Sequence, residues 1–468
     1  MHEKDWQFIN TAVAALIMVV LVAGSSISNE PAPEDPQSAD KVRETQPNVV
    51  FIISDDAGYG DFGFHGSTEI PTPHLDRLAD SGIQFTQGYV SASVCSPSRA
   101  GLMTGRCQQR FGHEMNIPAR WSEENGLPLD ETTWAELMQD AGYRTVALGK
   151  WHLGYAEKFQ PLQRGFDEFY GFLQGARSFW PLEKPTRMNH LRRDDEVLDE
   201  AGLFDYMTDE LGERTARFIE QNSDAPFFVY LSFNAVHTPM HALESDLEGV
   251  DADLPDKRRK LIAMTKALDR NVGLVLDTIE KAGVSDNTIV IFVNDNGGAT
   301  NNDSQNGVLR GTKGTPFEGG IRVPYLMRWP EKIEAGQRYD YPVSTLDLVP
   351  TCLAACEHQP QQELDLDGVN LLPYLTGESS GRPHETLFWR RGDNWAVRDG
   401  DLKLLSYKQS SPMLFDLSAD QSEQNDLADS RRDEVQRLTG LYESWSSEMI
   451  PPKWNSRSNR KSSPNKKK

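Results

Sequence analysis

The chain has 468 residues, of which 38% are hydrophobic and 25% charged, the balance of a globular protein with one large α/β domain and a smaller appended unit. Its formal net charge is −22, and because the last 18 residues carry seven Lys or Arg and no acid, the rest of the chain carries −29. A body this acidic repels nucleic acid and anionic lipid, which argues against a nucleic-acid partner and a stable membrane partner. An anionic substrate therefore needs a local group of cations or a metal ion at its site.

The N-terminus has the pattern of an export signal. A polar start that contains Lys4 precedes an apolar run of fourteen residues, Thr11–Gly24. This length suits a signal peptide over residues 1–28 and is short for a membrane-spanning helix. The sequence therefore predicts an exported protein, periplasmic or extracellular. An uncleaved membrane anchor stays an alternative, because Phe8 and Ile9 would lengthen the run.

After a Pro-, Glu-, Asp- and Ser-rich linker at residues 29–46, the chain alternates apolar strands with amphipathic helices up to residue 376. This alternation predicts an α/β catalytic domain over residues 47–376, with a large, mostly parallel sheet covered by helices on both faces. Helices are expected over residues 132–141 and 257–281. Four strands are especially clear: Asn48–Ser54, Tyr143–Gly149, Phe227–Phe233 and Thr288–Asn294.

A change of composition near residues 377–382 marks a second, smaller unit at residues 383–450. Strand patterns begin at Glu385, Trp395 and Met413, with a hairpin turn at Asp399-Gly400, and a helical pattern follows over residues 431–449. The sequence predicts a small antiparallel sheet plus one helix. The Lys-, Ser- and Asn-rich residues 451–468 are expected to form a basic, disordered tail.

Each of the four strands runs into polar, reactive side chains. The carboxyl ends of parallel strands share one edge of an open α/β sheet, and ligands bind beyond that edge. We therefore expect one functional site. The strand-end residues are Asp55 and Asp56 after the first strand, Lys150 and His152 after the second, His237 after the third, and Asp295 and Asn296 after the fourth.

The segment Cys95-Ser-Pro97-Ser-Arg99 places a thiol and an arginine before an apolar helical pattern. A helix N-terminus and Arg99 would stabilise negative charge on a nucleophile at Cys95. A capped helix start with a buried cysteine is the alternative, and composition alone favours it. The chain has four cysteines, too few for a disulfide scaffold; Cys352 and Cys356 are expected to pack in the core, and Cys107 has no obvious partner.

The Cys95 segment, C-x-P-x-R followed by A-x-L-x-T-G-R, resembles the modification motif of type I, formylglycine-dependent sulfatases in the alkaline phosphatase superfamily. Arylsulfatases and N-acetylgalactosamine-6-sulfatases are of this type. Phe317 stands where many members have Tyr, a mild departure that leaves the chemistry untouched. The similarity extends from Asn48 to about Leu427, and its further blocks are Asn48–Gly60, Gly149–Gly154, Arg164–Gly171, His237–Pro239, Asp295–Gly297 and Lys313–Gly320.

The resemblance implies that a maturation enzyme converts Cys95 to formylglycine (3-oxoalanine). It also implies a metal site made by Asp55, Asp56, residue 95, Asp295 and Asn296. Hard oxygen ligands without clustered His or Cys suit Ca²⁺ or Mg²⁺ rather than zinc. The resemblance favours Ca²⁺, with Mg²⁺ second.

The catalytic roles follow from this resemblance together with the chemistry of a sulfate monoester. Its hydrolysis moves charge onto the bridging oxygen and requires protonation of an alcohol leaving group. The expected cations around the sulfuryl oxygens are Arg99, Lys150 and Lys313, assisted by the metal. His237 with Lys313 is expected to protonate the leaving group.

The nucleophile implied by the resemblance is one hydroxyl of the formylglycine gem-diol, activated by the metal and by Asp295. Its attack forms a covalent sulfo-enzyme. His152 then removes the proton of the second hydroxyl, C–O cleavage expels sulfate, and the aldehyde returns. A plain Ser or Cys lacks that second hydroxyl.

The leading prediction is thus a calcium-dependent sulfatase acting on a sulfated carbohydrate. A phosphate or phosphonate ester hydrolase of the same superfamily is one alternative, and a catalytically inactive glycan-binding relative is another. His241 and the loop Arg177–Asp195, which includes Arg192 and Arg193, are open candidates for substrate contact. His65, His74 and His113 are interpreted as structural.

Overall fold

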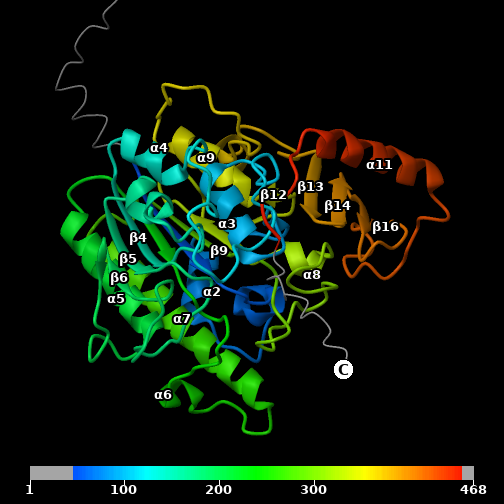
Figure 1. The fold of residues 1–468 in the computed structure, drawn as a ribbon. Helices are drawn as coiled ribbons and strands as arrows, with labels where there is room; N and C mark the ends of the chain where they lie inside the picture. The colour runs from blue at the N-terminus through cyan, green and yellow to red at the C-terminus, as the bar shows by residue number, and fades with distance from the viewer. Residues whose placement is uncertain (1–45, 456–468) are drawn as a thin grey trace, which may run out of the picture. The chain divides into compact units, whose positions relative to one another are not determined.

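A ten-stranded sheet forms the centre of the computed structural model, which describes residues 46–455 (Figure 1). The four inner strands pair in parallel, a fifth parallel strand follows them on one side, and antiparallel pairings come next on both sides. The mostly parallel sheet predicted from the sequence is confirmed. In spatial order the strands are β11 (Gln337–Tyr339), β2 (Ile83–Phe85), β10 (Tyr325–Arg328), β9 (Thr288–Asn294), β1 (Asn48–Ser54), β8 (Phe227–Ser232), β4 (Arg144–Lys150), β5 (Glu168–Phe172), β6 (Arg192–Arg193) and β7 (Glu196–Val197).

The four clear strands of the sequence are these four inner strands. The bounds of β1 and β9 are as predicted, β4 begins and ends one residue later, and β8 ends one residue earlier. All seven residues of β1 are buried, as expected for a strand with helices on both faces.

Alternate side chains of β1 enter two separate hydrophobic cores. Val50 and Ile52 pack with the helices on one face, and Val49, Phe51 and Ile53 with those on the other. Figure 1 shows the two helical layers. The first layer contains α2 (Pro73–Asp80), α5 (Met207–Asn222) and α7 (Asp256–Lys281); the second contains α3 (Cys95–Thr104), α4 (Trp134–Asp140) and α9 (Leu348–Ala355).

The remaining elements of the large domain are short. A two-stranded sheet pairs β3 (Gly88–Tyr89) with β12 (Val343–Ser344). The short helices are α6 (Glu244–Leu247), α8 (Glu318–Ile321) and α10 (Leu372–Leu375), with 3-10 turns at Tyr59–Asp61, Gly63–His65, Glu157–Phe159, Pro161–Gln163 and Thr345–Asp347.

The smaller unit is an antiparallel sheet covered by one helix, as predicted. The turn between its second and third strands uses Gly400, whose φ of 59° is readily adopted only by glycine. Its elements are β13 (Thr386–Arg391), β14 (Asn394–Asp399), β15 (Leu402–Ser406), β16 (Met413–Asp416) and α11 (Arg432–Ser447).

A buried ionic cluster joins the smaller sheet to the large domain. Lys403 Nζ lies 2.8 Å from Glu318 Oε1 and 2.8 Å from Glu423 Oε1, and all three side chains are excluded from solvent. Trp389 Nε1 donates a hydrogen bond of 2.7 Å to the Val90 carbonyl. The smaller sheet is therefore anchored beside α8 and the segment that precedes Cys95.

The four cysteines are buried and free of disulfides, and Cys352 and Cys356 pack in the core as expected. Within residues 46–455, no helix combines the length and the apolar character needed to cross a bilayer. The predicted signal peptide at residues 1–28, the linker up to residue 45 and the tail beyond residue 455 lie outside the described residues.

Candidate active site

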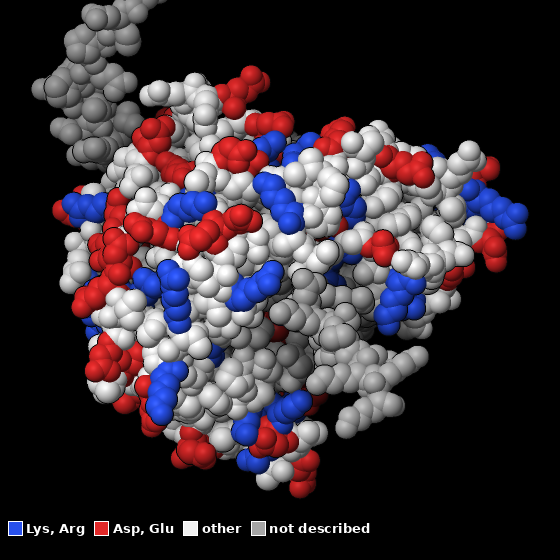
Figure 2. All heavy atoms as spheres, in the orientation of Figure 1, with Lys and Arg blue, Asp and Glu red and all other residues white. Residues whose placement is uncertain are grey.

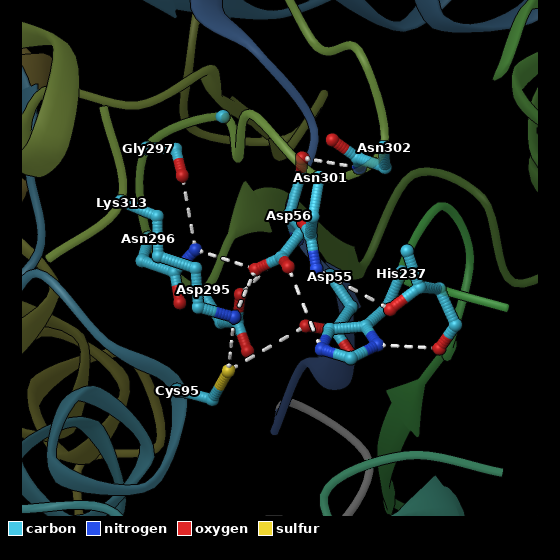
Figure 3. A network of polar contacts seen from close by, with 12 residues as sticks. Asp55, Asp56, Cys95, His237, Asp295, Asn296, Gly297, Asn301, Asn302 and Lys313 are labelled. Carbon is cyan, nitrogen blue, oxygen red and sulfur yellow. Dashed lines mark hydrogen bonds and ion pairs between the residues drawn. The ribbon is translucent and has the colours of Figure 1, made fainter. Parts of the chain in front are cut away.

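Side chains predicted at the strand ends lie together at one edge of the sheet, and Figure 3 shows those that follow β1, β8 and β9. The β1 end supplies Asp55 and Asp56, whose carboxylates contact Lys150 from β4, His237 after β8 and Asn296 after β9. Cys95 approaches the same place from α3, and Lys313 from the loop before α8. One site thus collects residues that are up to 258 positions apart, as the strand-end argument predicted.

The turn after β1 directs two successive carboxylates into this site. Asp56 has a φ of 64°, a left-handed conformation that Asp adopts more readily than most residues. Its carbonyl accepts hydrogen bonds from Asn302 Nδ2 at 3.1 Å and from Ser304 Oγ at 2.7 Å. Its N–H donates to Asp295 Oδ1 at 3.4 Å. Backbone bonding therefore fixes the turn and leaves the carboxylate of Asp56 free for the site.

Cys95 is the first residue of α3, and Pro97 stands in the first turn, where no intrahelical N–H is needed. Its Sγ lies 3.0 Å from Lys313 Nζ and 3.8 Å from Asp55 Oδ1. Burial, reinforced by Asp295, raises the pKa of the Cys95 thiol to about 12. An unmodified thiol at this position is protonated at neutral pH and is a poor nucleophile.

Arg99 lies one helical turn further along α3 and is fully buried. Its Nε and Nη2 donate to Asp295 Oδ2 at 3.0 and 2.9 Å, and Nη1 donates to Ser232 Oγ at 2.6 Å. Asp295 and its neighbours raise the pKa of Arg99 although burial opposes this. This guanidinium fixes the carboxylate of Asp295 by donating from Nε and Nη2 to the same oxygen, Oδ2.

Two lysines pair with the two carboxylates of the β1 end. Lys150 Nζ contacts Asp55 Oδ2 at 2.6 Å, and Lys313 Nζ contacts Asp56 Oδ1 at 2.5 Å. Burial alone would raise the pKa of Asp55, but Lys150 and the other cations lower it overall. Burial likewise opposes the charge on both lysines, yet Asp55 raises the pKa of Lys150, and residue 95 and Asp56 raise that of Lys313. Both lysines therefore remain charged.

His152 follows β4 in a left-handed conformation, with a φ of 59°. The preceding strand can approach β8 this closely because residue 149 is glycine: a Cβ atom there would lie 2.0 Å from the Ser232 carbonyl oxygen. Burial, with Lys150 and Arg99, lowers the pKa of His152 well below its usual value. The imidazole is therefore neutral at pH 7 and able to accept a proton.

His237 is oriented by its own backbone. Its Nδ1 lies 2.7 Å from the Thr238 carbonyl, which can only accept, so Nδ1 carries the proton of that bond. This leaves Nε2 pointed at Asp56 Oδ2, at 3.5 Å. A proton on Nε2 would be held between the imidazole and the carboxylate, the arrangement expected of a proton donor.

The donor atoms around Asp56 fit a hard divalent cation. One oxygen of Asp56, Oδ2, and the amide oxygen of Asn296 are buried and accept no hydrogen bond. Ligand atoms of Asp55, Asp56, Cys95 and His237 all lie within 4.8 Å of one another. Buried oxygen atoms that accept no hydrogen bond have lost the stabilisation that water would give them. A bound cation would restore it. Carboxylate and amide oxygens suit Ca²⁺ or Mg²⁺ better than softer metals.

The formal charges of the site balance before any ion is added. Three buried carboxylates, of Asp55, Asp56 and Asp295, face the three cations Arg99, Lys150 and Lys313. A divalent ion would leave a net charge of about +2 for an anionic ligand. On the face shown in Figure 2, Lys and Arg are interspersed with Asp and Glu, without one broad basic surface. The attraction for an anion is therefore local to the site.

Sequence reasoning missed several supporting residues. Asn302 and Ser304 hold the Asp56 turn, and Ser232 holds Arg99; of these only Ser232 ends a predicted strand. Ser96 Oγ donates to the His152 carbonyl at 2.8 Å and lies 2.6 Å from His113 Nε2. His113 is thus structural, as interpreted, but it supports the neighbour of Cys95.

The residues that the sequence left open as substrate contacts lie in different environments. His241 stacks on Trp180 with ring centroids 6.1 Å apart, away from the contacts of Asp56 and Cys95. Arg177 is buried against Glu200 at 2.5 Å and is unavailable to a ligand. Arg192 is half-buried in β6 and Arg193 is exposed.

Comparisons with known proteins agree with this geometry. The family model described as "Sulfatase" matches residues 47–358, and that of the "N-sulphoglucosamine sulphohydrolase, C-terminal" region matches residues 312–441. N-acetylgalactosamine-6-sulfatase of Canis lupus familiaris is 33% identical over 414 residues, 83% of this chain and 74% of that protein. Steryl-sulfatase of Homo sapiens is 29% identical over 435 residues, 74% of this chain and 72% of that protein.

Among solved structures, the crystal structure of Ps i-CgsB is similar, with a TM-score of 0.84 and 34% identity over 88% of this chain and 95% of that one. The same protein has been solved in complex with k-i-k-neocarrahexaose. The sulfatase model covers most of the α/β domain. The chain therefore belongs to the sulfatase family and is a sulfuric ester hydrolase.

Proposed function

We propose that this sulfatase removes sulfate from a sulfated carbohydrate by means of formylglycine at position 95 and a bound Ca²⁺ ion. The observation that carries the proposal is the position of Cys95. Its side chain projects from the first turn of α3 between Asp55 and Lys313, into the group of converging metal ligands. A thiol with a pKa near 12 has no evident use there, whereas a hydrated aldehyde does.

The proposed Ca²⁺ ligands are Asp55, Asp56, Asp295, Asn296 and residue 95. The unpaired oxygens Asp56 Oδ2 and Asn296 Oδ1 support this assignment. When bound, the ion supplies positive charge beside the sulfuryl oxygens and lowers the pKa of a coordinated hydroxyl. Mg²⁺ is the less favoured alternative because it demands a stricter octahedral geometry.

The hydrated aldehyde at residue 95 supplies one hydroxyl as nucleophile and a second hydroxyl through which sulfate is later expelled. Asp295, whose pKa is raised by burial and by Asp55, is placed to accept the proton of the attacking hydroxyl. Arg99 keeps that carboxylate in position through its bidentate contact. Lys150 and Lys313 orient and neutralise the sulfuryl oxygens.

Proton transfer at the leaving group falls to His237 and Lys313. His237 Nδ1 is committed to the Thr238 carbonyl, so the proton donated to the alcohol leaves from Nε2. Nε2 lies 3.5 Å from Asp56 Oδ2 and so faces the site. His152, held neutral by burial, accepts the proton of the second hydroxyl when sulfate is released.

The substrate class is proposed from chemistry and from relatives. With a divalent ion the site has positive charge for an anionic group such as sulfate, and a solved relative was crystallised in complex with k-i-k-neocarrahexaose. N-acetylgalactosamine-6-sulfatases are also similar to this chain. We further propose that the protein is exported by its N-terminal segment and that a maturation enzyme modifies Cys95.

The test is sulfate release from defined sulfated oligosaccharides, with product analysis, compared with phosphate release from an aryl phosphate. The proposal expects sulfate release that requires Ca²⁺ and is lost in Cys95→Ala. A strong preference for phosphate, or activity retained in Cys95→Ala, would contradict it. Mass spectrometry of the Cys95 peptide should show a mass about 18 Da lower than the thiol form. Mass spectrometry of the secreted protein's N-terminus should place it near residue 29.

A further inference from the structure

Arg391, at the end of β13, is a half-buried cation that contacts the loop of a catalytic lysine. Its Nη1 donates a hydrogen bond of 3.1 Å to the carbonyl of Gly314, the residue after Lys313. The Gly314 N–H donates to the Ser93 carbonyl at 2.7 Å, two residues before Cys95. The smaller sheet therefore places a guanidinium beside the loops that carry Lys313 and Cys95.

Within residues 46–455, Arg391 forms no ion pair with a carboxylate. Its Nε is buried without a hydrogen-bond partner. Glu114 is close enough to act on the charge of Arg391, but both oxygens of Glu114 are occupied. Glu114 Oε2 accepts from Arg390, and Oε1 accepts from the Gly392 N–H at 2.7 Å. Burial lowers the pKa of Arg391, the effect expected of a desolvated cation without a compensating anion.

The adjacent Arg390, in contrast to Arg391, has the ion pair and hydrogen bonds expected of a structural arginine. It forms an ion pair of 3.0 Å with Glu114 and donates 2.9 Å hydrogen bonds to Ser446 Oγ and to the Ile450 carbonyl. Arg390 therefore joins the end of β13 to α11 and to the segment that follows α3. Arg391 has no comparable set of partners, so packing alone does not account for its charge.

Another half-buried arginine, Arg328, also forms no ion pair with a carboxylate of the described residues, but it does not lie beside the catalytic loop as Arg391 does. It pairs with Val290 in the sheet, whereas Tyr325 of the same strand pairs with Val293, next to the catalytic end of β9. Arg328 therefore lies further from the carboxyl end of β9, and so from the catalytic side chains, than Tyr325 does. Arg391 is the one that contacts the catalytic loop, which makes the two residues a useful comparison.

A small hollow lies beside Arg391, lined in part by Ser93, Pro316 and Asn394. Its volume of about 10 Å³ is near the space of one water molecule, so it admits a single oxygen of an anionic group, and the rest of that group and its sugar ring would stay outside.

We propose that Arg391 binds a second anionic group of the substrate, a sulfate or a carboxylate on the sugar next to the one that loses its sulfate. This inference rests on the proposed sulfatase function and assigns a specificity-determining residue to the smaller sheet. Guanidinium pairs with sulfate and carboxylate through two parallel N–H bonds, and Arg391 has its Nε and Nη2 free for such a pair.

The test compares Arg391→Gln with Arg390→Gln and Arg328→Gln. The probes are galactose and N-acetylgalactosamine monosulfates, and disaccharides that join each to a second sulfated galactose or to glucuronate. For Arg391→Gln we expect kcat/KM to fall about tenfold on doubly anionic probes, mainly through KM, and to stay within about twofold on singly anionic ones. A loss confined to the sulfated or to the glucuronate probes identifies the group that binds.

Melting temperatures separate this role from a structural one. Arg391→Gln removes a desolvated cation that has no carboxylate partner within residues 46–455, so its melting temperature should equal or exceed that of the wild type. Arg390→Gln should melt lower and lose activity equally on all probes, and Arg328→Gln should keep the wild-type preference. An equal effect of Arg391→Gln on singly and doubly anionic probes would overturn the inference. Absence of sulfate release from every probe by the wild type would instead count against the proposed function.

Discussion

The imidazole of His152 packs directly against Gly175, where a Cβ atom would lie 2.4 Å from Cε1 and 2.6 Å from Nε2 of the ring. No real Cβ atom approaches another atom so closely, so any side chain at residue 175 must displace the ring. The loop after β5 thus sets the position of the proposed base.

We predict that Gly175→Ala lowers kcat by about 10²-fold, because a shift of roughly 1 Å in a catalytic group costs this much. KM should change little, since the cations that bind sulfate are untouched. Gly440→Ala is the matched control: no atom lies within 4 Å of a Cβ built at Gly440, in the middle of α11. That variant should keep full activity. Equal kcat values for the two variants would show that the His152 position is not critical.

Removal of the divalent ion should lower stability as well as activity. A ligand that binds only the folded state at 100 times its Kd adds about 2.7 kcal/mol to the free energy of unfolding. We therefore expect Ca²⁺ added to chelator-treated protein to raise the melting temperature, and Zn²⁺ not to reproduce this. Asp56→Ala should abolish the rise. A melting temperature that is indifferent to Ca²⁺ in the wild type would rule out the site.

Lys403 should be more important for stability than for catalysis. Its replacement by Met would leave the buried carboxylates of Glu318 and Glu423 close together without a cation. Breaking a buried ionic group in this way costs about 3–5 kcal/mol. Urea denaturation would measure this loss, while the kcat of the folded fraction should be retained. The exposed Lys281, changed to Met, should alter the free energy of unfolding by less than about 0.5 kcal/mol.

A pH dependence of stability follows from His384. Its Nε2 lies 2.7 Å from Asp347 Oδ1, and this carboxylate raises the pKa of His384 although burial opposes it. A raised pKa means that the folded state holds the proton more tightly than the unfolded state. The stabilisation is therefore complete below pH 6.5, the usual value, and is lost as the pH rises through the folded-state pKa. Equilibrium unfolding between pH 6 and 9 should show a decline that is smaller in His384→Gln.

Much of the site could be predicted because it is encoded locally. A continuous apolar run such as 48–54 forms a central strand wherever it occurs, and the residue after it must lie at the sheet edge. The same reasoning placed Lys150 and Asp295 correctly beside one another. The motifs then added Cys95, the first residue of α3, and Lys313, on the loop before α8, neither of which periodicity places in the site.

The remaining features depend on contacts between distant loops. Nothing in the sequence around Gly175 indicates that its missing side chain makes room for His152. Likewise Arg390 and Arg391 are two adjacent arginines in one strand, and only the fold assigns Glu114 to the first and leaves the second without a carboxylate. Such distinctions arise from tertiary packing and have no local signature.

Cys95 is 2% exposed, at the base of a site whose walls come from five separate segments. A maturation enzyme that modifies Cys95, as proposed, would have to bind the surrounding chain before α3 packs against the sheet, so folding and modification would compete for this segment during synthesis. A molecule that folded first would keep its thiol. Modified and unmodified molecules of the same fold and melting temperature would then coexist, and only the modified ones would be active. The specific activity of a preparation would depend on the fraction of molecules that were modified during synthesis. A kcat value would have to be calculated from the concentration of modified sites.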